Sequence, residues 1–133
     1  MFFTIDPSGG LPIYEQVVRQ IKFAVAGQVI KAGELVPSVR EVARQLTINP
    51  NTVARAFRQL QADGVLDPVR GTGLQVAGGA LELCRHERTN LIRSRLREVL
   101  TEARQSRLDE DEIRRLVESE LLATENQKEE VRS

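Results

Sequence analysis

Aromatic residues, cysteine and histidine are scarce in this sequence. The 133 residues include no tryptophan, one histidine and one cysteine, and aromatic residues make up 4% of the chain. The single cysteine, Cys84, excludes an internal disulfide and a cysteine-only metal site. The core must therefore be built from leucine, valine, isoleucine and alanine, and we expect no metal ion and no other cofactor.

Long hydrophobic runs are also absent. No apolar segment reaches the roughly 18 residues that a membrane span requires. Residues 1–6 carry no basic segment of the kind that opens a secretory signal peptide. We therefore expect a cytoplasmic protein with no membrane partner.

Neither sign of charge is in excess, since 19 basic and 19 acidic residues give a net charge of zero. This balance argues against a general polyanion binder, but residues 36–61 hold four arginines and one acid, Glu41. Such a local cluster is typical of a small electrostatic footprint on DNA. The chain has one histidine, one cysteine and no glycine-rich phosphate loop, so it offers no group of residues arranged for catalysis. We therefore expect that the protein is not an enzyme.

Two short helices are predicted near the middle of the chain. Ser38, followed three residues later by Glu41, has the pattern of a capping box that starts the first helix. Asn49 followed by Pro50 is a second start signal, and Gly64 is a stop signal. Two short helices joined by a tight turn predict a helix-turn-helix.

A further helix and a hairpin flank this pair. Apolar residues recur at helical spacing over residues 12–28. Residues 65–66 and 74–76 are predicted as strands around a glycine-containing turn at residues 70–73. A hairpin directly after a helix-turn-helix is the wing of a winged helix. We therefore expect a mainly α fold with a small β-hairpin, and a DNA-binding domain over residues 1–78.

The remainder of the chain is predicted to be helical. Gly78-Gly79 has the composition of a hinge, and apolar residues recur over residues 80–105. A second helix is expected to begin near Asp109, whose acidic neighbours fit a helix start better than a cation site. We expect residues 79–124 to form a helical dimerisation segment and residues 125–133 a frayed polar tail.

Two helices alone would cover their apolar side chains poorly. We therefore expect a homodimer with a two-fold interface, and a dimer should recognise an inverted repeat with two half-sites. The residues predicted to form the interface are Leu91, Leu96, Val99, Leu100, Ile113, Leu116, Val117 and Leu121.

Double-stranded DNA is the expected partner of the winged helix. The first part of the second helix of a helix-turn-helix reads base edges in the major groove. The start of this second helix and the start of the preceding helix each offer unpaired N–H groups that can hold a phosphate. The wing can reach the neighbouring backbone or minor groove. The candidates for DNA contact are Ser38, Arg40, Asn49, Asn51, Thr52, Arg55, Arg58, Arg70, Gly71 and Thr72.

Several of these candidates also fit a role without DNA. Ser38 and Asn49 fit capping alone, and Arg58 fits a solvated charge. Arg44, on the first helix of the pair, fits a solvated charge better than a contact. Arg40 and Arg55 fit DNA contact best, because each lies near a helix start within the same motif.

Five segments resemble the signature of GntR-family regulators: GLPIYEQV (10–17), ELVPSVREVA (34–43), INPNTVARAF (48–57), DGVL (63–66) and RGTG (70–73). The short remainder of the chain resembles the YtrA-type subfamily. This resemblance implies a dimeric transcription repressor whose tail has little room for an effector pocket. Whether a small-molecule effector exists is left open; the place we expect for one is near Gly78-Gly79.

Some positions depart from the family pattern. Asp67 and Pro68 replace a more polar or basic run, and Thr72 takes a position that is often basic, so Arg70 is the strongest wing candidate. Thr47 occupies a turn position that is often glycine, and we expect this turn to need no positive φ.

A protein-interaction adaptor is the alternative function, because a winged helix does not by itself fix what is bound. The zero net charge favours the adaptor, whereas the asparagine, threonine and arginine at one helix start favour DNA. Salt dependence of binding to random duplex DNA distinguishes the two.

Overall fold

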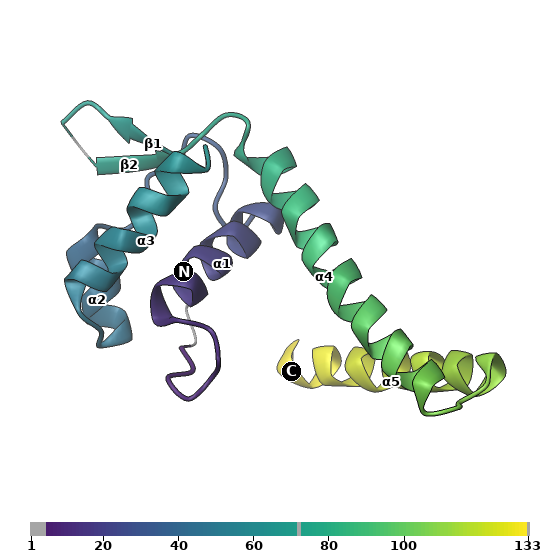
Figure 1. Cartoon of the computed structure of the whole chain (residues 1–133). Helices are drawn as coiled ribbons and strands as arrows, with labels where there is room; N and C mark the ends of the chain where they lie inside the picture. The colour runs from purple at the N-terminus through teal and green to yellow at the C-terminus, as the bar shows by residue number, and fades with distance from the viewer. Residues whose placement is uncertain (1–4, 72, 133) are drawn as a thin grey trace. The chain divides into compact units, whose positions relative to one another are not determined.

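The computed structural model describes residues 5–71 and 73–132, with side chains as far as residue 127. The helices are α1 (Ile13–Ala26), α2 (Val39–Leu46), α3 (Pro50–Ala62), α4 (Ala80–Gln105) and α5 (Glu110–Arg132), and the strands are β1 (Leu66–Val69) and β2 (Gly73–Val76) (Figure 1). The predicted mainly helical fold with one hairpin is confirmed. The chain divides into two compact units, Met1–Asn90 and Leu91–Ser133.

The core of the first unit lies between α1, α2 and α3. Helix α3 packs against both α1 and α2. Ile21 of α1 and Leu60 of α3 are fully buried, as are Val42 of α2 and Leu66 of β1. Burying a side chain of this size stabilises the fold by roughly 1.5–3 kcal/mol. This core fixes how the helix-turn-helix is presented to solvent.

The turn between α2 and α3 has a left-handed residue. Thr47 has φ 55° and ψ 48°, and the Ile48 N–H donates to the Ala43 carbonyl over 3.1 Å. This pattern ends a helix and normally takes glycine at the left-handed position. The expectation that the turn needs no positive φ was wrong. Thr47, the residue directly after α2, adopts the left-handed conformation so that the Ile48 N–H can reach the Ala43 carbonyl.

The wing has a third extended segment beside the hairpin. The two strands are antiparallel, with Leu66 opposite Val76 and Val69 opposite Gly73. On the other side of β2, the Val36 N–H donates to the Leu74 carbonyl over 3.0 Å, and an isolated bridge joins residues 35 and 75. Strand β1 is therefore an outer strand, where a proline such as Pro68 leaves no sheet hydrogen bond unmade.

The start of α4 is packed onto the first unit. Ala80 and Cys84 are 0% exposed, and the Arg85 Nε–H donates to the Ala26 carbonyl over 3.2 Å. Burial also raises the pKa of the Cys84 thiol to about 11. The division between the units falls after Asn90, inside α4, whereas the sequence indicated a boundary after residue 78. The glycine pair at residues 78–79 is therefore followed directly by a helix whose first turns are packed against the core.

The second unit contains the rest of α4 and α5. Asp109 caps α5, since its Oδ1 accepts a hydrogen bond of 2.8 Å from the Glu112 N–H. Ile113 is buried near this turn. Helix α5 continues through the polar residues 125–132, for which the sequence indicated fraying.

The part of the chain that the structure describes contains neither a membrane-spanning helix nor a metal-binding cluster. Within residues 5–71 and 73–132, no helix is long and apolar enough to cross a membrane. The same residues contain no group of three or more histidine, cysteine, aspartate or glutamate side chains placed to hold a metal ion.

Candidate nucleic-acid interface

Helix α3 has one buried and one exposed face. Its buried residues are Val53, Ala56, Phe57 and Leu60. Asn51, Arg55 and Arg58 are all exposed. At 3.6 residues per turn these three lie within about 60° of one another, on the side opposite the core. The structure therefore gathers three residues predicted to contact DNA on one solvent-facing surface.

Arg55 is held by a residue of α1. Its guanidinium carbon lies 3.7 Å from the centroid of the Tyr14 ring. This is a cation–π contact. Among the described residues Arg55 has no carboxylate partner, and its N–H groups make no hydrogen bond. The Arg55 guanidinium thus lies over the Tyr14 ring, and no described residue accepts a hydrogen bond from it.

The first N–H groups of α3 are already used. Pro50 has no N–H, and the Asn49 Oδ1 accepts from the Asn51 N–H over 2.8 Å. The Asn49 carbonyl accepts from the N–H of Thr52 over 3.0 Å. Asn49 is therefore a helix cap, and Thr52 is half-buried. A phosphate at this helix start would find no free first N–H.

The start of α2 is different. The Ser38 Oγ accepts from the Glu41 N–H over 3.1 Å, which confirms that Ser38 caps the helix. The N–H groups of Val39 and Arg40 have no partner in the described part of the chain, and Arg40 is exposed without an ion pair. Backbone donors and a free guanidinium at one helix start suit a phosphate.

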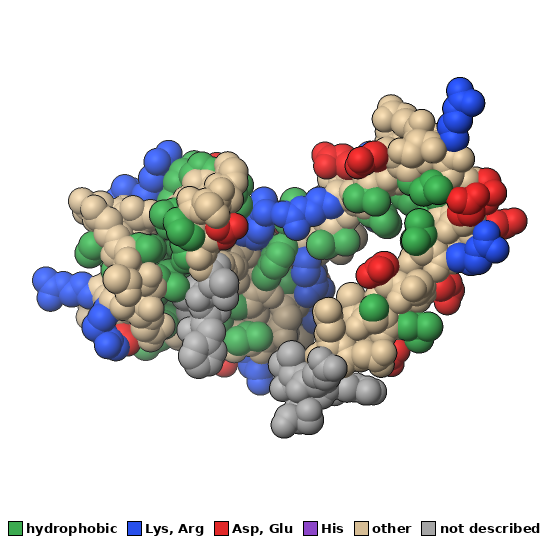
Figure 2. All heavy atoms as spheres, turned by 90° about the horizontal axis from the view of Figure 1, so that it is seen from below, with side chains coloured by type: hydrophobic (Ala, Val, Ile, Leu, Met, Phe, Trp, Pro, Cys, Tyr) green, Lys and Arg blue, Asp and Glu red, His purple; other side chains and the backbone are tan. Residues whose placement is uncertain are grey.

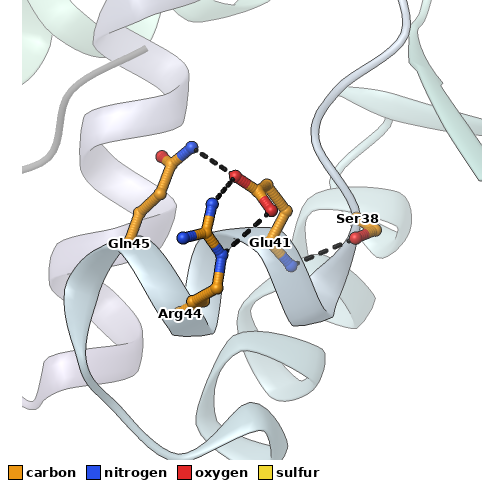
Figure 3. A network of polar contacts seen from close by, with 4 residues as sticks. All are labelled: Ser38, Glu41, Arg44 and Gln45. Atoms are coloured by element: carbon orange, nitrogen blue, oxygen red, sulfur yellow. Dashed lines mark hydrogen bonds and ion pairs between the residues drawn. The ribbon is translucent and has the colours of Figure 1, made fainter.

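Only half of the predicted capping box is formed. The Glu41 carboxylate does not return to the Ser38 N–H; it accepts from Arg44 Nη2 over 2.6 Å and from Gln45 Nε2 over 3.0 Å (Figure 3). These hydrogen bonds hold the pKa of Glu41 below its usual value, and Glu41 in turn raises the pKa of Arg44. The charge of Arg44 is therefore locally balanced.

Charge pairing separates the arginines of the helix-turn-helix into two groups. Arg44 is paired with Glu41. In the described residues, Arg40, Arg55 and Arg58 form no salt bridge. An unpaired arginine keeps its full charge and donors for a phosphate or a base edge. The structure thus supports Arg40, Arg55 and Arg58 over Arg44 as candidates.

The tip of the wing has one exposed charge and two left-handed glycines. Arg70 is exposed and unpaired in the described residues. Gly71 has φ 80° and Gly73 has φ 97°, so the turn bends sharply at both. Thr72 lies outside the described residues. Nothing in the geometry of the wing adds a second basic group to Arg70.

The predicted interface residues of the tail are mostly exposed in the single chain. Val99 is 60% and Leu121 is 61% exposed, and Leu96, Leu116 and Val117 are also exposed. Leu91 and Leu100 are half-buried, and Ile113 is buried. Ile92 and Leu122, which were not among the predicted interface residues, are exposed as well. Figure 2 shows such apolar side chains, in green, at the surface of the tail helices.

Three polar residues of α1 that the sequence did not single out make contacts to other segments of the first unit. Tyr14 holds Arg55. Lys22 pairs with Asp63 and Glu87 at 2.8 Å and 2.7 Å. Gln16 is buried, and its Nε2 donates to the carbonyls of residues 6 and 11. A polar residue at a position that helical periodicity places on the buried face could have indicated these contacts, because a buried polar side chain needs a hydrogen-bond partner.

Two adjacent helices, a left-handed turn and a following hairpin define a winged helix-turn-helix protein. The profile of the gntR family of bacterial regulatory proteins matches residues 13–76. HTH-type transcriptional repressor YtrA of Bacillus subtilis (strain 168) is 33% identical over 99 residues, which are 74% of this chain and 76% of that protein. The chain belongs to the GntR family.

Solved structures share this architecture. A transcriptional regulator from Oenococcus oeni has a TM-score of 0.72 and 33% identity, over 90% of this chain and 99% of that chain. The AraR DNA-binding domain, solved in complex with operator ORX1, has a TM-score of 0.52 and 26% identity, over 58% of this chain and 99% of that one. The first likeness thus extends well beyond the winged helix.

Proposed function

We propose that this protein is a transcription regulator that binds double-stranded DNA sequence-specifically and represses as a homodimer on an inverted-repeat operator. The observation that carries the proposal is the exposed face of α3. Asn51, Arg55 and Arg58 lie together there, opposite the core, with no carboxylate partner in the described residues. That composition matches the hydrogen-bonding groups of base edges and phosphates.

The relatives support the same function. YtrA of Bacillus subtilis is named as a repressor, and the AraR domain was solved on an operator. Because the chain covers 76% of the length of YtrA, the comparison includes part of the tail as well as the winged helix. Repression by occupying a promoter is the simplest output for such a protein.

The reading step follows from the face of α3. The major groove admits one helix, and an arginine reads guanine by donating two hydrogen bonds to its O6 and N7 atoms. Asn51 and Arg55, in the first two turns, are the residues we assign to base edges. Arg58, one turn further, and Arg40, at the start of α2, are assigned to phosphates, with Arg70 of the wing beside them.

Dimerisation supplies the second half-site. One winged helix makes few base contacts, so a palindromic operator requires two copies held in a fixed relation. Ile92, Leu96 and Val99 recur at i, i+4 and i+7 along α4 and are exposed in one chain. A second copy of the chain is the occupant that we propose for this apolar stripe, together with that of α5.

Selection of bound sequences from a random duplex pool tests the proposal. We expect an enriched inverted repeat, with affinity that falls steeply as salt rises, because several phosphates are neutralised. Arg55→Ala should reduce the preference for that sequence over random DNA by about 1–3 kcal/mol at fixed salt. Enrichment of a single half-site would contradict the proposed homodimer. No binding to any duplex at low salt would overturn DNA binding and favour the protein-interaction adaptor.

A further inference from the structure

The contact between Tyr14 and Arg55 joins α1 to the exposed face of α3. We propose that Tyr14 is a positioning residue for base reading: its ring fixes the Arg55 guanidinium so that the arginine meets DNA with its N–H edge. This inference rests on the proposed function, because it assumes that Arg55 contacts a base.

The geometry fits a cation–π clamp on the guanidinium. The guanidinium carbon is 3.7 Å from the ring centroid, which is van der Waals contact. Tyr14 lies in the first turn of α1 and is half-buried, packed against the core cluster, so its ring is held from behind. Arg55 lies in the second turn of α3 and is exposed. One side of the arginine is therefore anchored and the other faces solvent.

The electrostatics of the ring strengthen the contact. The Tyr14 hydroxyl donates a hydrogen bond of 3.1 Å to the Glu15 Oε1. Donation to a carboxylate increases the electron density of the ring, and an electron-rich face attracts a cation. Glu15 itself forms no salt bridge with Arg55 in the described residues. The ring, not a carboxylate, therefore holds the arginine, and no hydrogen-bond donor is consumed.

This arrangement has a consequence for specificity. Guanidinium N–H groups point outward in the plane of the group, so stacking on one face leaves all five donors available. A free arginine must lose its rotamer freedom when it binds a base, whereas a stacked one has lost part of it beforehand. Tyr14 should therefore increase discrimination between base sequences more than it increases affinity for DNA in general.

The experiment compares Tyr14→Leu, Tyr14→Phe and Arg55→Ala in the full chain, with the operator obtained by selection. Circular dichroism melting first establishes that each variant is folded at the assay temperature. The preference for operator over random duplex is then measured at one salt concentration. We expect Tyr14→Leu to lower this preference by about three- to tenfold, Tyr14→Phe to retain most of it, and affinity for random duplex to change little.

The double variant Tyr14→Leu with Arg55→Ala decides whether Tyr14 acts through Arg55. If it does, Tyr14→Leu costs little further preference once Arg55 is alanine. Additive losses would overturn the inference, and so would Tyr14→Phe behaving like Tyr14→Leu. If Arg55→Ala instead kept the wild-type preference for operator over random duplex, Arg55 would not contact a base. That result would contradict the proposed function. Loss of preference in Arg55→Ala with none in Tyr14→Leu would remove only the positioning role.

Discussion

The Lys22 Nζ lies 2.7 Å from the Glu87 Oε2, so a salt bridge joins α1 to the first turns of α4. The same ammonium lies 2.8 Å from the Asp63 Oδ2, at the end of α3. Lys22 is only 15% exposed. One lysine thus connects α1, which precedes the helix-turn-helix, with the end of α3 and the first turns of α4.

Lys22→Met should therefore weaken the first unit and change its pH dependence. Partly exposed ion pairs contribute modestly, so we expect a loss of about 1 kcal/mol at pH 7. The measurement is thermal unfolding followed by circular dichroism across pH. Lys31→Met is the matched control, because Lys31 is exposed and forms no salt bridge with the described residues. A loss as large in the control would show that the effect is not specific to the pairing.

The direction with pH follows from the two shifts. Burial alone would raise the pKa of Asp63, but hydrogen bonds from Lys22 and Gln59 outweigh it and lower that pKa below 3.8. Its stabilisation is therefore present above pH 3.8 and is lost as pH falls through the folded value. Burial alone would lower the pKa of Lys22, but its two carboxylate partners raise it above 10.5. That contribution is lost as pH rises beyond 10.5. Wild type and Lys22→Met should differ most between these limits and converge at both extremes.

Thr47→Gly should stabilise the protein. A β-branched residue in the left-handed region is strained by roughly 1–2 kcal/mol, and glycine removes this strain while adding some unfolded-state entropy. We expect a net gain of about 1 kcal/mol in denaturant unfolding. Gly64, with φ 81° and no atom within 4 Å of an added Cβ, ends α3 in the same way. Gly64→Ala is the converse control and should destabilise. A Thr47→Gly variant no more stable than wild type would contradict the strain.

Local signals in the sequence predicted the elements of the fold well. Ser38, Asn49 and Gly64 marked helix ends because capping and left-handed preferences act within a few residues. The apolar periodicity of α3 also predicted which side would be exposed, and therefore grouped Asn51 with Arg55. These features depend on neighbours three or four residues apart, which the sequence displays directly.

Contacts between distant residues could not be predicted in the same way. Tyr14 contacts Arg55 because α1 packs against α3. Lys22 pairs with Glu87 because the start of α4 lies against α1. The glycine pair at residues 78–79 indicated a hinge by composition. Packing at Ala80 and Cys84 anchors the following helix instead.

Arg40→Ala and Arg44→Ala should differ although both lie on α2. Arg40 has no salt-bridge partner among the described residues, whereas Arg44 is paired with Glu41. If Arg40 neutralises a phosphate, its loss should weaken binding to all duplexes and reduce the slope of log affinity against log salt by about 1. Arg44→Ala should leave that slope nearly unchanged. Binding titrations at four or more salt concentrations measure it, and equal slopes for the two variants would remove Arg40 from the phosphate contacts.

Leu96→Asp with Val99→Asp should convert the proposed homodimer into monomers. Both side chains are exposed in the single chain, at 49% and 60%, so the substitutions disturb no packing within it. In an interface they would bury two carboxylates without partners, which is strongly unfavourable. Light scattering should show half the wild-type mass, with the first unit still folded. Because the two half-sites are then bound independently, affinity for the operator should fall by about 100-fold or more.

The control for this variant carries the same added charge on another side of α4. Ser94→Asp with Thr101→Asp places two carboxylates at exposed positions away from the stripe formed by residues 92, 96 and 99. We expect this control to keep the dimer mass and the affinity for the operator. If both variants remain dimers, the interface lies outside this stripe. If both are monomers, added negative charge anywhere on α4 is enough to dissociate the dimer. Monomers in the first alone assign dimerisation to the apolar stripe, because only the position of the charge differs.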